Sequence, residues 1–190
     1  YAPEMDMLFP RMWKHHDNAE TYYTDWVGRH GSMVNVDGKE YYKPSFGDNI
    51  VFFGAYQLGY MYLRYLMWNF SGRYDDRQGF GSLQKGQFIT GIPFVDRWYV
   101  GSSVTPPSSL PRDAHNRYFM IPLVLGIVGA ANIRRRSKPV FWFVMVLFLM
   151  GGPVLSVYLN HPLYEPRERD YAYILSFYAY AMFCAFGARR

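Results

Sequence analysis

The feature of this sequence that most limits its fold is a charged turn, residues 160–170, between two apolar segments, residues 140–159 and 171–188. At ~1.5 Å per helical residue, each apolar segment is about long enough to cross the ~30 Å hydrocarbon core of a bilayer. The turn carries two arginines and three carboxylates, which are costly at a membrane boundary unless they are paired or hydrated. The sequence therefore predicts a membrane hairpin with a polar site at its end.

Two interpretations of this turn compete. In the first the turn is structural: Pro166 begins the next helix, Glu168 and Asp170 lie near its positive N-terminal end, and the arginines face lipid headgroups. In the second, Arg167 and Arg169 bind a phosphate, because a guanidinium offers a planar pair of donors to an anion. Spacing alone favours the structural interpretation.

The composition points to a membrane–water interface. Aromatic residues make up 20% of the chain, including 18 tyrosines and 15 phenylalanines, and amphipathic rings settle at headgroup depth. The net charge of +5 comes partly from basic clusters beside apolar segments, which indicates topology signals or anionic headgroups and argues against nucleic acid as a partner. The single cysteine, Cys184, excludes an intrachain disulfide framework.

The predicted fold class is an integral membrane protein, mainly α-helical, with about three transmembrane helices in residues 118–190 and an external aromatic-rich α+β module in residues 1–117. Basic clusters at 134–136 and 189–190 mark the cytoplasmic side, so the external module and the charged turn are expected on the opposite side, in the bacterial inner membrane. Ala181 and Ala185, together with Ser176, Tyr178 and Tyr180, predict that the last helix packs against other helices. The three spans are expected near residues 118–133, 140–159 and 171–188, with a kink in the second at Gly-Gly-Pro, residues 151–153.

The external module is expected to contain a β-hairpin and an interfacial helix. Residues 33–42 are strand formers on both sides of an Asp-Gly pair, which provides the positive φ angles of a two-residue turn. Residues 49–70 are apolar but contain Gln57, Arg64 and Asn69, which favours a helix lying in the interface or packed beneath the polar module. Residues 71–116 are loop-rich, as binding loops and lids often are.

Metal-ligand patterns are weak. The histidines at 15–16 are adjacent, so their side chains would diverge on a helix, and His161 with Glu165 has a proline between the two and no evident third ligand. Asp75 and Asp76 either lie in a solvated turn or hold a divalent ion. We therefore assign no metal-binding residues. The one cofactor that the sequence leaves open is a divalent metal.

Four stretches, taken together, carry a family resemblance: FPRM at 9–12, KPSFGDN at 43–49, YLRYLMWNFSGR at 62–73 and YEPRERDYAY at 164–173. In these the chain resembles a bacterial multi-span membrane family of unknown function that is similar to the transmembrane protein O-mannosyltransferases of the C-type glycosyltransferase superfamily. The resemblance extends over essentially the whole chain, whose place is that of a middle-to-C-terminal fragment. The last of the four stretches is the most specific.

This resemblance implies an integral membrane enzyme that moves a sugar from a polyprenyl-phosphate donor to an exported acceptor protein. The catalytic base of such enzymes lies in the first external loop, upstream of this chain, so no catalytic residue is assigned and the fragment alone is expected to be inactive. The alternative is a non-enzymatic membrane scaffold or a polysaccharide-export subunit. The substrate-binding candidates are Arg167 and Arg169, oriented by Glu168 and Asp170, together with Tyr171, Arg64, Asn69 and Arg73.

Overall fold

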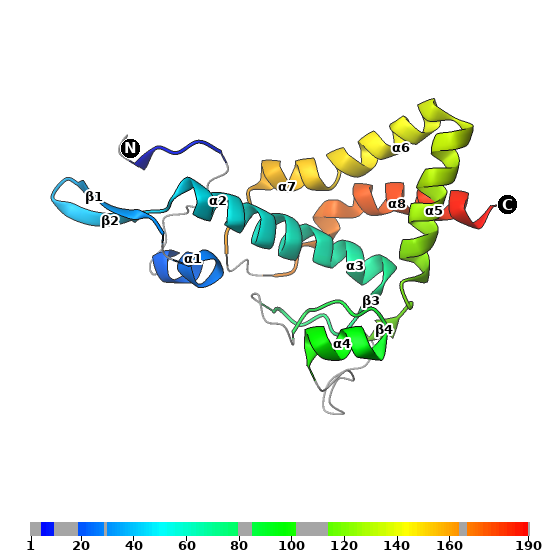
Figure 1. Ribbon diagram of the computed structural model, residues 1–190, viewed down its shortest axis with the longest axis horizontal. Helices are drawn as coiled ribbons and strands as arrows, with labels where there is room; N and C mark the ends of the chain where they lie inside the picture. The colour runs from blue at the N-terminus through cyan, green and yellow to red at the C-terminus, as the bar shows by residue number, and fades with distance from the viewer. Residues whose placement is uncertain are drawn as a thin grey trace.

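The chain is mainly helical, as predicted, with two small two-stranded sheets. The computed structural model describes residues 5–9, 19–28, 30–79, 85–101, 114–163 and 167–189. Helices α2 and α3, α6 and α7, and α8 lie side by side in the middle of the molecule, and α5 crosses them at one end (Figure 1). The helices are α1 (Ala19–Val27), α2 (Phe46–Phe52), α3 (Arg64–Phe70), α4 (Pro93–Val100), α5 (Ile121–Arg136), α6 (Lys138–Met150), α7 (Pro153–Leu159) and α8 (Ile174–Ala188).

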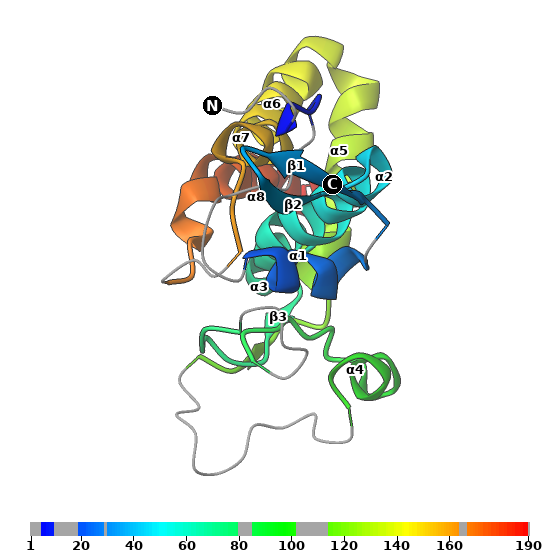
Figure 2. The same cartoon turned by 90° about the vertical axis from the view of Figure 1, so that its left-hand side faces the viewer.

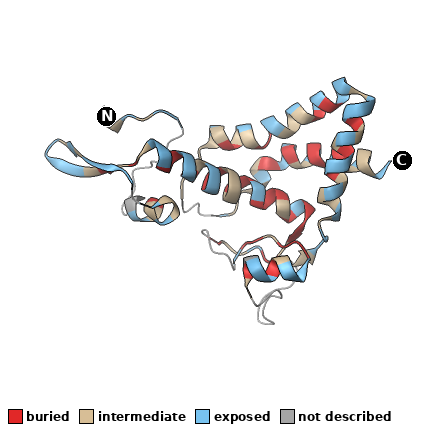
Figure 3. Cartoon of the chain, viewed as in Figure 1, coloured by how far each residue is buried: buried red, intermediate tan, exposed pale blue. Residues whose placement is uncertain are grey.

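A long helical unit joins α2 to α3 through a π-helical segment, Phe53–Leu63. It begins at Phe46, three residues before the predicted start, because Ser45 and Asp48 form a capping box. One side of the unit is buried and packs against α7 and the start of α8, so it is a core helix of this fold. Figure 3 shows the buried residues concentrated on α3 and α8. Placement of the predicted helix in a membrane interface stays a prediction.

The predicted hairpin is confirmed. Strands β1 (Ser32–Val36) and β2 (Lys39–Lys43) pair in antiparallel register, and Asp37 and Gly38 between them have φ angles of 52° and 80°. Positive φ at both positions is what a two-residue turn of this kind requires. The hairpin projects from the helical body at the end where α2 begins (Figure 1, Figure 2).

Asp48 connects this hairpin to the long helical unit. Its carboxylate accepts a hydrogen bond from the Ser45 backbone N–H at 3.0 Å and lies 2.8 Å from His30 Nδ1, while the Tyr42 hydroxyl donates to it at 3.4 Å. Burial alone would raise the pKa of Asp48, but the hydrogen bonds from Ser45 and His30 outweigh burial and lower that pKa below its usual value.

Replacing Asp48 with alanine is expected to cost about 1–2 kcal/mol of folding free energy at neutral pH, because the Ser45 backbone N–H loses the charged acceptor that completes the capping box. Since the folded-state pKa is depressed, the contribution of the carboxylate is fully present above the unfolded pKa of roughly 4 and is lost as the pH falls through the folded pKa. Denaturant unfolding of the wild-type protein and the variant from pH 7 downward should show that the difference between their unfolding free energies narrows below about pH 4. A difference that stays constant across this range would contradict a stabilising role of the Asp48 carboxylate.

Two helices in the described part of the chain are long and apolar enough to cross a membrane: Lys138–Leu159, which contains α6 and α7, and Asp170–Ala188, which contains a 3₁₀ turn and α8. They coincide with the predicted segments 140–159 and 171–188. Only 28% of the most apolar window of each is buried, so most of each helix faces outward. Large apolar side chains remain exposed on them, among them Trp142, Phe143, Val146, Ile174, Tyr178 and Met182.

The third predicted span, residues 118–133, corresponds to α5. This helix has 16 residues, about 24 Å at ~1.5 Å per residue, which is shorter than the ~30 Å bilayer core. It crosses α8 instead of running along it (Figure 1). The described part of the chain therefore contains two candidate spans, not three.

The crossing of α5 and α8 depends on glycines. A Cβ added at Gly129 would overlap the Phe183 carbonyl oxygen and lie 2.6 Å from the Gly187 nitrogen. Close backbone approach through small residues is typical of packed membrane helices. Of the residues predicted to pack in α8, Ser176 and Tyr180 are buried, together with Ala179 and Phe183. Tyr178, Ala181 and Ala185 are exposed.

A break separates α6 from α7 at Gly151 and Gly152, where the sequence predicts a kink. The Tyr62 ring occupies the space beside it: a Cβ at Gly152 would lie 2.5 Å from the Tyr62 Cζ atom. The Tyr62 hydroxyl also lies 2.8 Å from Ser176 Oγ in α8. The break thus lets the long helical unit pack directly between the two candidate spans.

The described part of residues 71–116 contains regular structure where the composition predicts loops. It includes α4 and β3 (Gly72–Arg73), which pairs in antiparallel fashion with β4 (Asn116–Arg117). The sequence signal for α4 is Pro93 in the first turn, a position where a missing backbone N–H is harmless.

Candidate functional site

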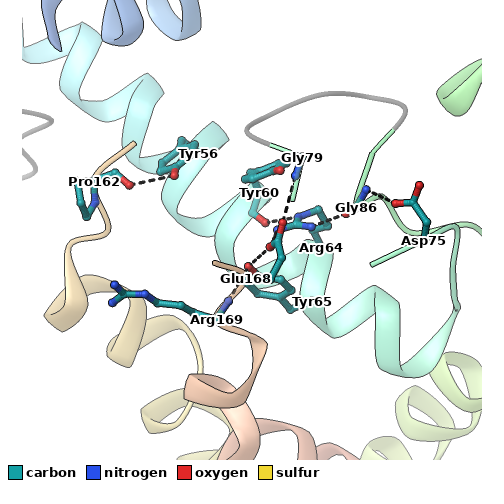
Figure 4. A network of polar contacts seen from close by, with 10 residues as sticks. All are labelled: Tyr56, Tyr60, Arg64, Tyr65, Asp75, Gly79, Gly86, Pro162, Glu168 and Arg169. Carbon is teal, nitrogen blue, oxygen red and sulfur yellow. Dashed lines mark hydrogen bonds and ion pairs between the residues drawn. The ribbon is translucent and has the colours of Figure 1, made fainter. Parts of the chain in front are cut away.

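Arg64 is the centre of a buried polar network between the long helical unit and the charged turn (Figure 4). Its side chain is only 2% exposed, and its Nη2 atom lies 2.6 Å from Glu168 Oε2. Nε donates to the Tyr60 carbonyl at 3.0 Å, and Nη1 donates to the Gly86 carbonyl. The guanidinium therefore joins three segments that are far apart in sequence.

Glu168 completes this network from the charged turn. Its Oε2 atom accepts hydrogen bonds from Arg64 and from the Tyr65 hydroxyl, and its Oε1 atom accepts one from the Gly79 backbone N–H at 3.3 Å. The Tyr65 oxygen in turn accepts the backbone N–H of Arg169 at 3.1 Å. A buried carboxylate with this many donors is well compensated for the water it loses.

Three aromatic rings surround the Arg64 guanidinium. Its Cζ atom lies 4.0 Å from the centroid of Tyr60, 4.3 Å from that of Tyr65 and 4.8 Å from that of Trp68. Burial alone would lower the pKa of Arg64, but Tyr60, Tyr65 and Glu168 raise it above the usual value, so the cation is kept. Burial raises the pKa of Tyr65, which keeps its hydroxyl protonated as a donor to Glu168.

The segment that follows α3 is tied into the same network by Asp75. This carboxylate is buried, accepts the Gly86 backbone N–H, and lies 2.7 Å from Arg77 Nη2. Asp75 therefore does not lie in a solvated turn, because it is buried and pairs with Arg77, whereas Asp76 is exposed. Gly86 receives one hydrogen bond from Arg64 and gives one to Asp75, which fixes its position.

The two ends of the charged turn are also tied to the long helical unit. The Tyr56 hydroxyl donates to the Pro162 carbonyl at 3.0 Å. Gln57 Nε2 donates to Asn160 Oδ1 at 2.9 Å and to the His161 carbonyl at 3.1 Å. Together with the contacts of Glu168, these bonds place both sides of the turn against one helical unit.

Arg167 differs from the other charged residues of the turn. It is exposed, its Nη2 atom lies 3.2 Å from the Tyr171 hydroxyl, and its Cζ atom lies 5.5 Å from the centroid of that ring. Among the described residues, no carboxylate forms an ion pair with Arg167. Arg169 is half-buried, and Asp170 begins the 3₁₀ turn that leads into α8.

Asn69 and Arg73 lie at the end of α3. Asn69 is exposed and its Nδ2 atom donates to the Tyr65 carbonyl at 2.8 Å. Arg73 Cζ lies 4.3 Å from the centroid of the Trp68 ring, which Arg64 also contacts. Arg64 and Arg73 are therefore brought together around one indole.

The structure brings only some of the predicted site residues together. Arg64 and Glu168 form one unit, and Arg167 and Tyr171 form another on the surface. The expectation that Glu168 orients its neighbouring arginines is not met for Arg167, because the Glu168 carboxylate is engaged with Arg64.

Sequence reasoning missed the aromatic surroundings of Arg64. A signal for them was present, since Tyr60, Arg64 and Trp68 are spaced four residues apart along one helical unit, which places them on one side. The contributions of the Gly79 and Gly86 backbone had no such signal, because glycine spacing does not show which chain segment lies opposite.

No group of three potential metal-ligating side chains occurs within the residues that the structure describes. The histidines at 15–16 and Glu165 lie outside the described residues. His161 is buried beside Tyr173, with ring centroids 6.1 Å apart.

Comparison with known proteins gives one match. A family of unknown function, DUF8416, matches residues 1–54. This match covers the hairpin and the start of the long helical unit, and ends before Arg64 and the charged turn. No curated protein and no solved structure matches the chain.

Proposed function

We propose that this chain is part of a membrane glycosyltransferase of the C type, and that Arg167 and Arg169 hold the phosphate of a polyprenyl-phosphate sugar donor. The sugar would pass to an exported protein on the non-cytoplasmic side of a bacterial inner membrane. The resemblance of the PRERDYAY stretch supports the class of enzyme.

One observation carries the phosphate proposal: the exposed Arg167 at the polar end of the candidate span Asp170–Ala188. With that helix across the bilayer, a guanidinium there would lie at the depth of the phosphate of a lipid-linked donor, next to the hydrocarbon. The neighbouring carboxylate of Glu168 is occupied by Arg64, so it does not compete for this cation. Tyr171 holds the guanidinium from one side and leaves its other donors available.

Arg64 has a different role in this proposal from that of a phosphate ligand. It is buried and its donors are directed to Glu168, Gly86 and Tyr60. It would therefore act as a positioning residue, which fixes the backbone of residues 168–169 so that the arginine side chains project from a rigid turn. Asn69 and Arg73 would lie farther along the same donor-binding surface.

The membrane placement of this proposal follows the charge pattern. Helices α6–α7 and α8 would cross the bilayer, with the basic clusters at 134–136 and 189–190 on the cytoplasmic side. A third span through α5 would require flanking residues or local thinning of the bilayer, because α5 is short. The glycine contacts with α8 would keep α5 within the membrane region.

The test uses the full-length protein in its host, with Arg167→Ala and Arg169→Ala combined. Glycosylation of exported proteins, read by lectin blot and mass spectrometry, should fall by about 10²-fold or more, the usual effect of removing a group that stabilises charge at the reaction centre. Membrane levels should be unchanged by immunoblot. Lys39→Ala, an exposed charge change on the hairpin, is the matched control and should glycosylate normally.

Normal glycosylation by the double variant would refute the donor-phosphate proposal and leave the turn with a structural role. The alternative, a membrane scaffold or polysaccharide-export subunit, would be favoured if protein glycosylation is unchanged even when the whole gene is deleted.

A further inference from the structure

Helix α4 presents a large apolar face to its surroundings. Phe94 and Trp98 are each 84% exposed, and the four-residue spacing places them on one side of the helix. Ile92, directly before the helix, is 44% exposed. None of these side chains is covered by the residues that the structure describes.

The orientation of α4 is fixed from its opposite side. The Asp96 side chain is 1% exposed, and its Oδ1 atom accepts hydrogen bonds from the Thr90 backbone N–H and hydroxyl, both at 2.7 Å. Its Oδ2 atom accepts the Gly91 backbone N–H at 2.9 Å. Rotating α4 to bury Phe94 and Trp98 would break these three bonds and leave a buried carboxylate without donors, which is costly. The apolar face is therefore a stable feature of the fold.

This face is continuous with the start of α5. A Cβ at Gly91, which has a φ of +80°, would lie 2.8 Å from the Phe119 ring, so the beginning of α4 touches the residues that lead into α5. Phe119 and Ile121 are 58% and 59% exposed. The outer side of α5 carries further exposed apolar residues, Val124, Ile127 and Val128.

Cations and aromatic rings border this apolar surface. Arg97 on α4 and Arg117 just before α5 are both exposed, and Tyr118 is 41% exposed. Tryptophan and tyrosine with basic residues beside an apolar helix are the composition of a membrane interface, where rings lie at headgroup depth and cations pair with anionic lipid.

We propose that α4 is a membrane-interface anchor, which inserts Phe94 and Trp98 into the boundary between headgroups and acyl chains of the bilayer that α6–α7 and α8 would cross. The apolar face of α4 contacts lipid, and Arg97 and Arg117 face anionic headgroups. The inference rests on the membrane placement in the proposed function but is independent of sugar transfer. Its effect would be to hold the segment between α3 and α5 against the membrane surface.

The test measures depth in the bilayer with spin labels. In the full-length protein with Cys184→Ala and any other cysteines removed, Phe94→Cys and Trp98→Cys are each labelled and reconstituted in vesicles of phosphatidylethanolamine and phosphatidylglycerol. Two controls use exposed positions elsewhere, Met33→Cys in the hairpin and Tyr178→Cys in α8. Collision with oxygen and with a water-soluble nickel chelate gives the depth of each label.

Labels at positions 94 and 98 are expected about 5–10 Å below the lipid phosphates. The label at 33 should lie in water, and the label at 178 should lie deeper in the hydrocarbon than both. If the labels at 94 and 98 are as open to the nickel chelate as the label at 33 while 178 is in lipid, the anchor is refuted and the membrane placement stands. A label at 178 in water would refute the placement and the anchor together.

Discussion

Replacing Glu168 with leucine is expected to destabilise the protein by about 3–5 kcal/mol, because it leaves the buried Arg64 guanidinium without its carboxylate. Arg64 is 2% exposed, so water cannot replace the lost partner unless the network opens. The Tyr65 hydroxyl and the Gly79 N–H lose their acceptor as well. Thermal and denaturant unfolding of the detergent-solubilised protein would measure the change.

Replacing the other partner of the ion pair, by Arg64→Met, should destabilise the protein less than Glu168→Leu. Glu168 is 13% exposed and keeps the Tyr65 and Gly79 donors, so its carboxylate still has hydrogen-bond partners and some contact with water. Methionine also fills the space between the aromatic rings without burying a charge. The double variant should recover much of the loss seen for Glu168→Leu alone, since replacing both partners of a buried pair by apolar groups is often close to neutral.

A double-variant cycle separates this explanation from a simple packing defect. If the ion pair is the cause, the coupling free energy between positions 64 and 168 should exceed about 1 kcal/mol. Additive effects of the two substitutions, or equal costs for the two single variants, would contradict the buried-pair explanation.

The second large effect is expected at the α5–α8 crossing. Gly129→Ala adds one Cβ that would overlap the Phe183 carbonyl oxygen, and the obstacle is backbone that cannot rotate away. The two helices must therefore separate, at a cost of about 1–3 kcal/mol or more. The loss should appear as a lower Tm in detergent and as weaker protection of the α5 and α8 amides in hydrogen exchange.

Gly54→Ala is the matched control. Gly54 also lies in a helical segment, but nothing is within 4 Å of the added Cβ. Alanine is favoured over glycine in helices by about 1 kcal/mol, so this variant should be neutral or slightly more stable. Equal destabilisation by the two substitutions would contradict the close crossing as the cause, because only Gly129 has backbone atoms in the way of the added Cβ.

Local sequence patterns predicted the local structure well. The Asp-Gly pair specified the hairpin, Gly151 and Gly152 specified the break between α6 and α7, and long apolar runs specified the two candidate spans. In each case the signal and the structure lie within the same few residues, and no distant contact is needed.

Predictions that depended on distant contacts were less successful. Arg64 looked like an interruption in an apolar helix, because the carboxylate that pairs with it is 104 positions away. The same limit explains why Glu168 was assigned to its sequence neighbours. A charged residue selects its partner by three-dimensional packing, which the order of residues along the chain does not show.

The third predicted span, residues 118–133, is not one of the two candidate spans in the described part of the chain and stays a prediction. The helix begins at Ile121, so a crossing would need flanking residues or a thinner bilayer. Its glycines at 126 and 129 serve the contact with α8.

The Arg64 network has a mechanical consequence. Because the guanidinium binds Glu168 with one nitrogen and the Gly86 carbonyl with another, the charged turn and the segment after α3 share one buried cation. Glu168 also accepts the Gly79 backbone N–H, so the turn contacts that segment directly. A displacement of the turn therefore removes partners from both Arg64 and Gly79.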